Sequence, residues 1–206
     1  MSAKQHKLPK NWPSNLQFIS SLDISKDLSK YLEIASGICR FSPKDIAAME
    51  RISISKFYGF SSSKQLSVSP TALNSVKIES LADKPSHPAS PYFGLFATKN
   101  LSPGQLIIPY YGKVTTSENA SETSDYCLRL NCLAVDADSS GNEGRYVNDY
   151  RGILDKPNAE FKEFINTDYN RVEMGIFVIS SKLHGGIKKK QEICVSYGKG
   201  FWSARK

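Results

Sequence analysis

The sequence predicts a mostly β domain of short strands, preceded by a small helical N-terminal region. Three observations predict this architecture. The composition changes near residue 90, from a part rich in Ser and Lys to a part with short apolar runs. Turns of Gly, Pro, Asn and Asp separate those runs, as is typical of β domains. Only two segments, both before residue 90, have helical periodicity. We therefore expect a basic region over residues 1–89 and one domain over residues 90–206.

The first expected helix covers residues 25–35. Four apolar or aromatic side chains recur there at the i, i+3, i+4, i+7 spacing that places them on one face: Leu28, Tyr31, Leu32 and Ala35. Gly37 then provides a helix terminator.

The second expected helix begins at Ser42. Ser42 suits the N-cap, Pro43 the first helical position, and Asp45 completes a capping box. An apolar stripe follows, which we expect in the core rather than on a ligand-binding face: Ile46, Met49 and Ile52.

Residues 61–90 are rich in Ser, Lys and Pro and predict a loop-rich connection. The strand candidates come after it. They are short apolar or alternating runs at residues 94–97, 106–111, 126–130, 133–135, 174–179 and 192–197.

Composition narrows the class of protein. Hydrophobic residues make up 40% of the 206, with ten Phe and ten Tyr, so a real core is expected rather than disorder. No apolar run approaches the roughly 20 residues that span a bilayer, and the N-terminal MSAKQHKLPK has no apolar stretch typical of a secretory signal. We expect a soluble, intracellular protein.

The four cysteines are Cys39, Cys127, Cys132 and Cys194, and there are three His. No CxxC pair occurs, whereas structural zinc sites usually need paired short spacings. We expect reduced thiols, no disulfide and no metal.

The net charge of +7 is unevenly distributed. Residues 1–90 carry 12 Lys and Arg against 7 Asp and Glu, and residues 91–206 carry 15 against 13. The basic N-terminal part would suit contact with nucleic acid or an acidic surface, although a merely soluble basic surface is an equal alternative.

One stretch, GNEGRYVNDY at residues 141–150, poses a chemical question. Asn148 and Asp149, an amide and a carboxylate, come directly after the strand-like Arg145-Tyr146-Val147. Because buried polar groups need hydrogen-bond partners, either a tight turn or a bound ligand is expected at this point.

Four blocks in a fixed order carry a family resemblance. Residues 92–114 read YFGLFATKNLSPGQLIIPYYGKV, and residues 126–149 read YCLRLNCLAVDADSSGNEGRYVND. Residues 157–179 read PNAEFKEFINTDYNRVEMGIFVI, and residues 192–202 read EICVSYGKGFW. The succession resembles the SET domain of protein-lysine methyltransferases over about residues 90–202. The resemblance implies a β-clip-like SET domain with a knot-like crossing, the methyl donor S-adenosylmethionine, and a ligand for Asn148.

The resemblance also implies a donor site. Its members would be Phe93, Gly94, Leu95, Tyr126, Arg145, Asn148, Asp149 and Trp202. Phe93 and Gly94 match a glycine-turn motif that acts mostly through its backbone. Arg145 would contact the donor or brace the crossing.

Lysine methylation needs a neutral amine, although a free lysine has a pKa near 10.4. A narrow, dry, aromatic channel would disfavour the ammonium form by desolvation. Tyr197 matches the family's catalytic tyrosine, and Tyr126 and Tyr110 match further tyrosines of the active site. A strand-end or half-buried aromatic is the alternative reading of each.

The substrate channel would include Phe161, Val195 and Phe201. The limiting aromatic residue of the family stands either two before the catalytic tyrosine, here Val195, or three after the Asn of the "PN" pair, here Phe161. A Phe has no hydroxyl to hold an ordered water, so we expect transfer of more than one methyl group.

Among the departures from the family pattern, Tyr92 replaces a glycine, Lys113 replaces an acid, and Asp149 replaces a histidine. No cysteine-rich segment flanks the blocks within the 206 residues, so we expect a SET domain without zinc-binding flanks.

Two functions follow. The first is a protein-lysine methyltransferase in the nucleus, with a histone tail as leading substrate and nucleosomal DNA contacted by the basic N-terminal region. Five acids are expected around the peptide groove: Glu118, Glu122, Asp125, Asp138 and Glu143. The second is a catalytically weak SET-like module that recruits chromatin or other protein partners, favoured by the three departures. A plain nucleic-acid binder would rest on net charge alone.

Overall fold

A computed structural model describes residues 8–36, 41–58, 75–180 and 185–203. Its strands are β1 (Gln17–Phe18), β2 (Glu50–Ile52), β3 (Val76–Ser80), β4 (Phe93–Ala97), β5 (Leu106–Pro109), β6 (Lys113–Thr116), β7 (Cys127–Leu130), β8 (Leu133–Asp136), β9 (Ser140–Gly141), β10 (Asn148–Asp149), β11 (Ala159–Asn166), β12 (Arg171–Val178) and β13 (Cys194–Val195). Its α-helices are α1 (Lys26–Ser29), α2 (Pro43–Ala48), α3 (Ile54–Phe57) and α4 (Gly198–Ser203). Within the described residues the short 3₁₀ helices are η1 (Ile34–Ser36), η4 (Ser117–Asn119) and η5 (Glu143–Tyr146). The predicted mostly β fold is confirmed.

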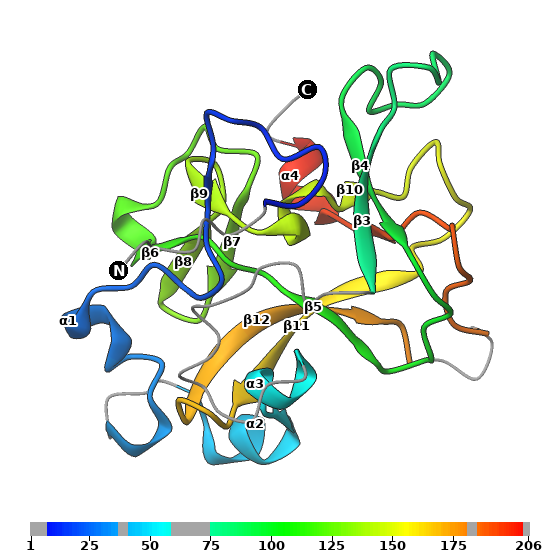
Figure 1. The fold of residues 1–206 in the computed structure, drawn as a ribbon. Helices are drawn as coiled ribbons and strands as arrows, with labels where there is room; N and C mark the ends of the chain where they lie inside the picture. Colours follow the sequence, from blue (N-terminus) through cyan, green and yellow to red (C-terminus); the bar gives the residue numbers. More distant parts are fainter. Residues whose placement is uncertain (1–7, 37–40, 59–74, 181–184, 204–206) are drawn as a thin grey trace, which may run out of the picture.

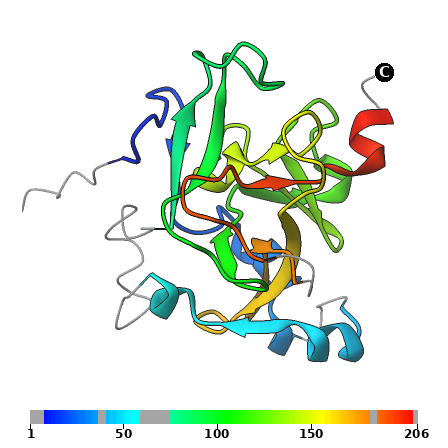
Figure 2. The same cartoon turned by 90° about the vertical axis from the view of Figure 1, so that its right-hand side faces the viewer.

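Small sheets surround a shared core (Figure 1). The largest has the order β2-β11-β12-β5, and β11 and β12 form its long antiparallel hairpin. A second sheet has the order β6-β8-β7, and the remaining pairs are β1-β9, β3-β4 and β10-β13. In Figures 1 and 2, α4 lies at the opposite end of the molecule from α2 and α3.

The segments before residue 90 share sheets with those after it. β1 pairs with β9 in parallel, β2 with β11 in parallel, and β3 with β4 in antiparallel register. Trp12 packs edge-on against Phe18 and Tyr146, with ring centroids 5.0 and 5.8 Å apart. One hydrophobic cluster therefore contains residues from both predicted regions.

The helical predictions hold at their starts and fail at their ends. The capping box at Ser42 is present, with Asp45 N donating to Ser42 Oγ over 3.1 Å and Pro43 in the first turn. The helix ends at Ala48, however, and Ile52 lies in β2 rather than on a helical stripe. The expected helix over residues 25–35 is only the four-residue α1 followed by η1.

The expected loop over residues 61–90 is wrong in one part. Residues 59–74 lie outside the described residues, but Val76–Ser80 form β3, whose alternating burial fits a strand with one covered face. All six strand candidates contain a strand, whereas the two-residue strands β1 and β10 and the eight-residue β11 were not predicted.

Candidate functional site

The site forms where two distant segments of chain lie side by side. β10 pairs in parallel with β13, and Tyr150 N donates to Val195 O over 2.9 Å. The hydroxyl of Tyr197, just beyond β13, donates to Val147 O, just before β10, over 2.8 Å. Residues 147–149 and Tyr197, 48 positions or more apart in the sequence, therefore lie in contact.

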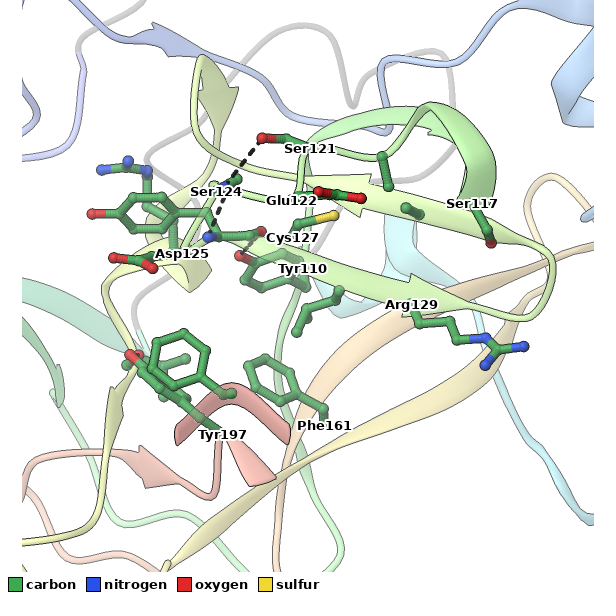
Figure 3. A pocket seen from close by; sticks show the side chains of 17 residues that line it. Tyr110, Ser117, Ser121, Glu122, Ser124, Asp125, Cys127, Arg129, Phe161 and Tyr197 are labelled. Carbon is green, nitrogen blue, oxygen red and sulfur yellow. Dashed lines mark hydrogen bonds between the residues drawn. The ribbon is translucent and has the colours of Figure 1, made fainter. Parts of the chain in front are cut away.

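A cavity of about 640 Å³ opens beside this crossing (Figure 3). Its aromatic lining consists of Tyr110, Tyr126, Phe161, Tyr197 and Phe201. The Tyr110 and Phe161 rings meet edge-on at 5.6 Å between centroids, and those of Tyr197 and Phe201 at 4.7 Å. Five of the six expected catalytic and channel residues therefore line the same cavity.

The Tyr197 hydroxyl is an acceptor towards any ligand. Burial, followed by the negative charge of Asp149, raises the pKa of Tyr197, so the phenol stays protonated at neutral pH. Because its proton is donated to Val147 O, the oxygen lone pairs are left for a donor group in the cavity.

Tyr110 serves a different purpose from Tyr197. Its hydroxyl donates to Tyr126 O over 2.7 Å, which fixes the start of the β7 segment. Burial raises the pKa of Tyr110, so this phenol is also neutral. Its ring lines the cavity while its hydroxyl supports the backbone of a second lining residue.

Arg145 braces the crossing. Its Nε donates to Ala137 O over 2.9 Å, and its guanidinium lies 4.0 Å from the centre of the Tyr126 ring. This cation–π contact holds the Tyr126 ring at the cavity. Of the two roles expected for Arg145, the geometry favours bracing.

Phe93 and Gly94, the two residues that match the glycine-turn motif, lie beside Asn148. Asn148 Nδ2 donates to Phe93 O over 3.2 Å and to Glu192 Oε1 over 2.9 Å. A Cβ on Gly94 would lie only 2.7 Å from Glu192 Oε1 and 3.2 Å from Asn148 Nδ2. Position 94 therefore needs a glycine for Asn148 to keep this place. Leu95 is fully buried in the core, which leaves only its backbone for contact with a ligand.

Glu192 and His87 also belong to the site, although neither was among the predicted site residues. Glu192 is 8% exposed and joins Asn148 to His87, whose Nε2 lies 2.9 Å from Glu192 Oε2. The place of Glu192 at the head of the last matching block was a usable signal. His87 gave none, because it lies in a stretch that the sequence presents as a loop.

Asp149 and Trp202 complete the site. Trp202 Nε1 donates to Asp149 Oδ2 over 3.3 Å, and the Trp202 ring stacks on Tyr197 with an interplanar angle of 16°. The Phe201 ring contacts both of these rings edge-on. Helix α4 thus adds two aromatic side chains to the crossing.

Two expectations about the groove need correction. Val195 is fully buried and is not among the residues lining the cavity, whereas Phe161 is. Of the five acids, Glu122 and Asp125 line the cavity. Glu143 lies in η5 with 5% of its surface exposed, and burial raises its pKa to about 7, so it cannot belong to an open groove.

The described residues contain no group of three or more His, Cys, Asp or Glu side chains that could hold a metal ion. Cys127, Cys132 and Cys194 are free thiols. No helix within the described ranges is long and apolar enough to cross a membrane.

The family model for the SET domain matches residues 92–198, more than half of the chain. The chain belongs to the SET domain family. Proteins with this domain are generally protein-lysine methyltransferases. No curated protein sequence matches the chain.

Several solved SET-domain structures are similar to the chain. KRYPTONITE in complex with mCHH DNA, H3(1-15) peptide and SAH is 19% identical with a TM-score of 0.43, over 60% of this chain and 23% of that one. An active polycomb repressive complex 2 in the basal state is 20% identical with a TM-score of 0.47, over 63% and 16%. The ctPRC2 complex bound to S-adenosylmethionine is 22% identical with a TM-score of 0.46, over 64% and 16%. The chain thus spans less than a quarter of the length of each.

Proposed function

We propose that this SET domain is a protein-lysine N-methyltransferase that uses S-adenosylmethionine. The observation that carries the proposal is the meeting of Tyr197, Asn148 and an aromatic cavity at one backbone crossing. A neutral acceptor oxygen at the end of an apolar wall suits an amine that must lose its charge before it can act as a nucleophile.

The residues around the crossing fit the donor. A Cβ on Gly94 would press on Glu192 Oε1 and Asn148 Nδ2, so the glycine lets Asn148 keep the side-chain orientation that Phe93 O and Glu192 fix. The donor-binding residues would be Phe93, Gly94, Leu95, Tyr126, Asn148, Asp149 and Trp202, while Arg145 braces the crossing. When bound, S-adenosylmethionine supplies an electrophilic methyl group on a sulfonium.

The chain's own residues would prepare the lysine. The rings of Tyr110, Tyr126, Phe161 and Phe201 exclude water around the lysine side chain and so lower the pKa of its ammonium. The Tyr197 oxygen accepts a hydrogen bond from the amine and orients the nitrogen lone pair. Phe161, which offers no hydroxyl, leaves space for transfer of more than one methyl group.

A basic protein segment is the proposed substrate, with a histone tail the leading class. Glu122 and Asp125 line the same cavity as the aromatic rings, together with Arg129 and Arg145, and the two carboxylates offer ion pairs to a basic segment. The N-terminal region carries most of the +7 charge and would contact nucleosomal DNA. Such a substrate implies a nuclear protein.

Donor binding tests the proposal, and isothermal titration calorimetry with S-adenosylmethionine measures it. A peptide array with labelled donor then identifies the methylated segment. Saturable binding and transfer to lysine-containing peptides are expected. Absence of binding heat at high donor concentration would reject the enzyme.

That negative result would favour the second candidate, a SET-like module that recruits protein partners. Two observations support this candidate. Both hydrogens of the Asn148 amide have partners within the protein, and Tyr92, 71% exposed, stands where the family pattern has glycine.

A further inference from the structure

The Asp149 carboxylate gathers hydrogen bonds from three other residues. Its Oδ2 accepts from Tyr197 N over 2.8 Å and from Trp202 Nε1 over 3.3 Å. Arg151 donates through its backbone N to Oδ1 over 3.0 Å and through Nη1 to both oxygens over 2.9 and 2.8 Å. The Asp149 side chain is only 5% exposed.

Arg151 connects the carboxylate to helix α4 as well. Its guanidinium lies 5.5 Å from the Trp202 ring centre and 5.2 Å from that of Tyr150. Arg151 is 43% exposed in its side chain, so it closes the cluster from the solvent side. Asp149, Arg151, Tyr197 and Trp202 form what we call the Asp149 clasp.

The clasp acts on the catalytic tyrosine through its backbone. Tyr197 is held at two points: its hydroxyl by Val147 O and its backbone N–H by Asp149 Oδ2. Both anchors come from the strand β10 and the residue just before it. The Tyr197 side chain therefore spans a fixed distance between two attachment points on one segment, which sets the position of its oxygen in the cavity.

We propose that Asp149 is a positioning residue. Its carboxylate holds Tyr197 and the Trp202 end of α4 in the geometry that methyl transfer requires. The effect on turnover rests on the proposed function, whereas the anchoring of Tyr197 does not. The family pattern has a histidine at this position, where this chain has Asp149 in an ion pair with Arg151.

Charge is central to the anchor. Burial by itself would raise the pKa of Asp149, but the hydrogen bonds from Tyr197 N, Arg151 and Trp202 outweigh burial and hold the pKa below the ordinary 3.8. The carboxylate is therefore ionised at neutral pH, so both of its oxygens can accept hydrogen bonds from the donors around it. An amide in its place would present an NH₂ group to at least one of those donors.

The test compares Asp149→Asn, Asp149→His and Asp149→Glu with Arg151→Gln. Steady-state kcat and KM are measured on a peptide substrate, and hydrogen exchange of the Tyr197 amide is measured by NMR. Asn and His are expected to lower kcat about 10- to 100-fold with little change in peptide KM, because a misplaced catalytic group costs about that much. The Tyr197 amide should lose protection in both, while the Tyr150 amide bonded to Val195 O keeps its protection.

The two remaining variants separate charge from packing. Asp149→Glu keeps the carboxylate and should retain more turnover and more amide protection than Asn. Arg151→Gln leaves the acceptor in place and should keep the Tyr197 amide protected.

Unchanged kcat and unchanged protection in Asp149→Asn and Asp149→His would overturn the proposal, as would a Glu variant that behaves like Asn. If the wild-type chain transfers no methyl group, the proposed function fails, while the exchange data still decide whether Asp149 anchors Tyr197.

Discussion

Replacing Tyr197 by Phe separates catalysis from stability at the centre of the site. The change removes one oxygen and the 2.8 Å hydrogen bond to Val147 O, but keeps the ring that packs on Phe201 and Trp202. Losing that hydrogen bond is expected to cost about 1 kcal/mol of unfolding free energy. For a chain of this size the melting temperature should fall by about 2–4 °C.

The effect on turnover should be larger than the effect on stability. Removing a single polar group that acts on the transition state typically lowers kcat about 10²-fold, or about 2.7 kcal/mol. Labelled-methyl transfer to a peptide substrate measures kcat, and calorimetry confirms that the donor still binds. A kcat close to that of the wild type, together with the expected small loss of stability, would refute the catalytic role of Tyr197.

Tyr169→Phe is the matched control. It removes the same atom from a tyrosine that is 41% exposed and does not line the cavity. Its turnover should equal that of the wild type. A drop in Tyr169→Phe as large as that in Tyr197→Phe would show that the assay reports a general loss of folded protein.

Three further predictions concern other parts of the site. Gly94→Ala places a Cβ 2.7 Å from Glu192 Oε1 and should weaken donor affinity roughly 10- to 100-fold by displacing Asn148, as calorimetry would show; unchanged affinity would contradict the fit. Phe161→Tyr adds a hydroxyl beside Tyr110 and should shift products towards fewer methyl groups by mass spectrometry, and an unchanged distribution would remove Phe161 from that role. Glu143 has a pKa raised from 4.5 to about 7 by burial, so the folded state holds its proton more tightly than the unfolded state. Its contribution to stability is thus complete below pH 4.5 and is lost as the pH rises towards 7, by about 3 kcal/mol. Glu143→Gln should flatten this decline in melting temperature between pH 4.5 and 7, and parallel curves for the two proteins would contradict it.

The strand pattern of the sequence was sufficient for the fold class. Alternating and apolar runs marked β4, β5, β7, β8, β12 and β13 because these strands bury side chains on at least one face. β1 and β10 are two residues long, and their position depends on backbone pairing with distant strands. Pairing of that kind leaves no periodicity to detect.

The helical region shows the opposite problem. Local signals placed the start of α2 at its capping box correctly, since a cap depends on a few neighbouring residues. Where the helix ends depends on β2, which pairs with β11 more than a hundred residues away and draws Ile52 into a strand. Tertiary pairing overrides local periodicity there.

The sequence predicted which residues meet at the candidate site better than it predicted the contacts between them. The spacing of the four blocks identified Tyr197, Asn148 and Phe161, which the structure brings to one crossing. The sequence could not show that Asp149 bonds to Tyr197 N or that Glu192 links Asn148 to His87, because these contacts join residues 44 to 105 positions apart. Val195 matched a channel position by spacing, but its side chain turns into the core.

The shared sheets have a practical consequence for anyone dissecting this protein. A fragment begun near residue 90, at the edge of the family match, would strip β3 from β4 and β2 from β11 and leave those ladders with bare edges. It would also uncover the apolar surface on which Trp12, Leu32 and Ile54 now rest. Such a fragment should aggregate, and a failure to methylate would then say nothing about the chemistry of the crossing.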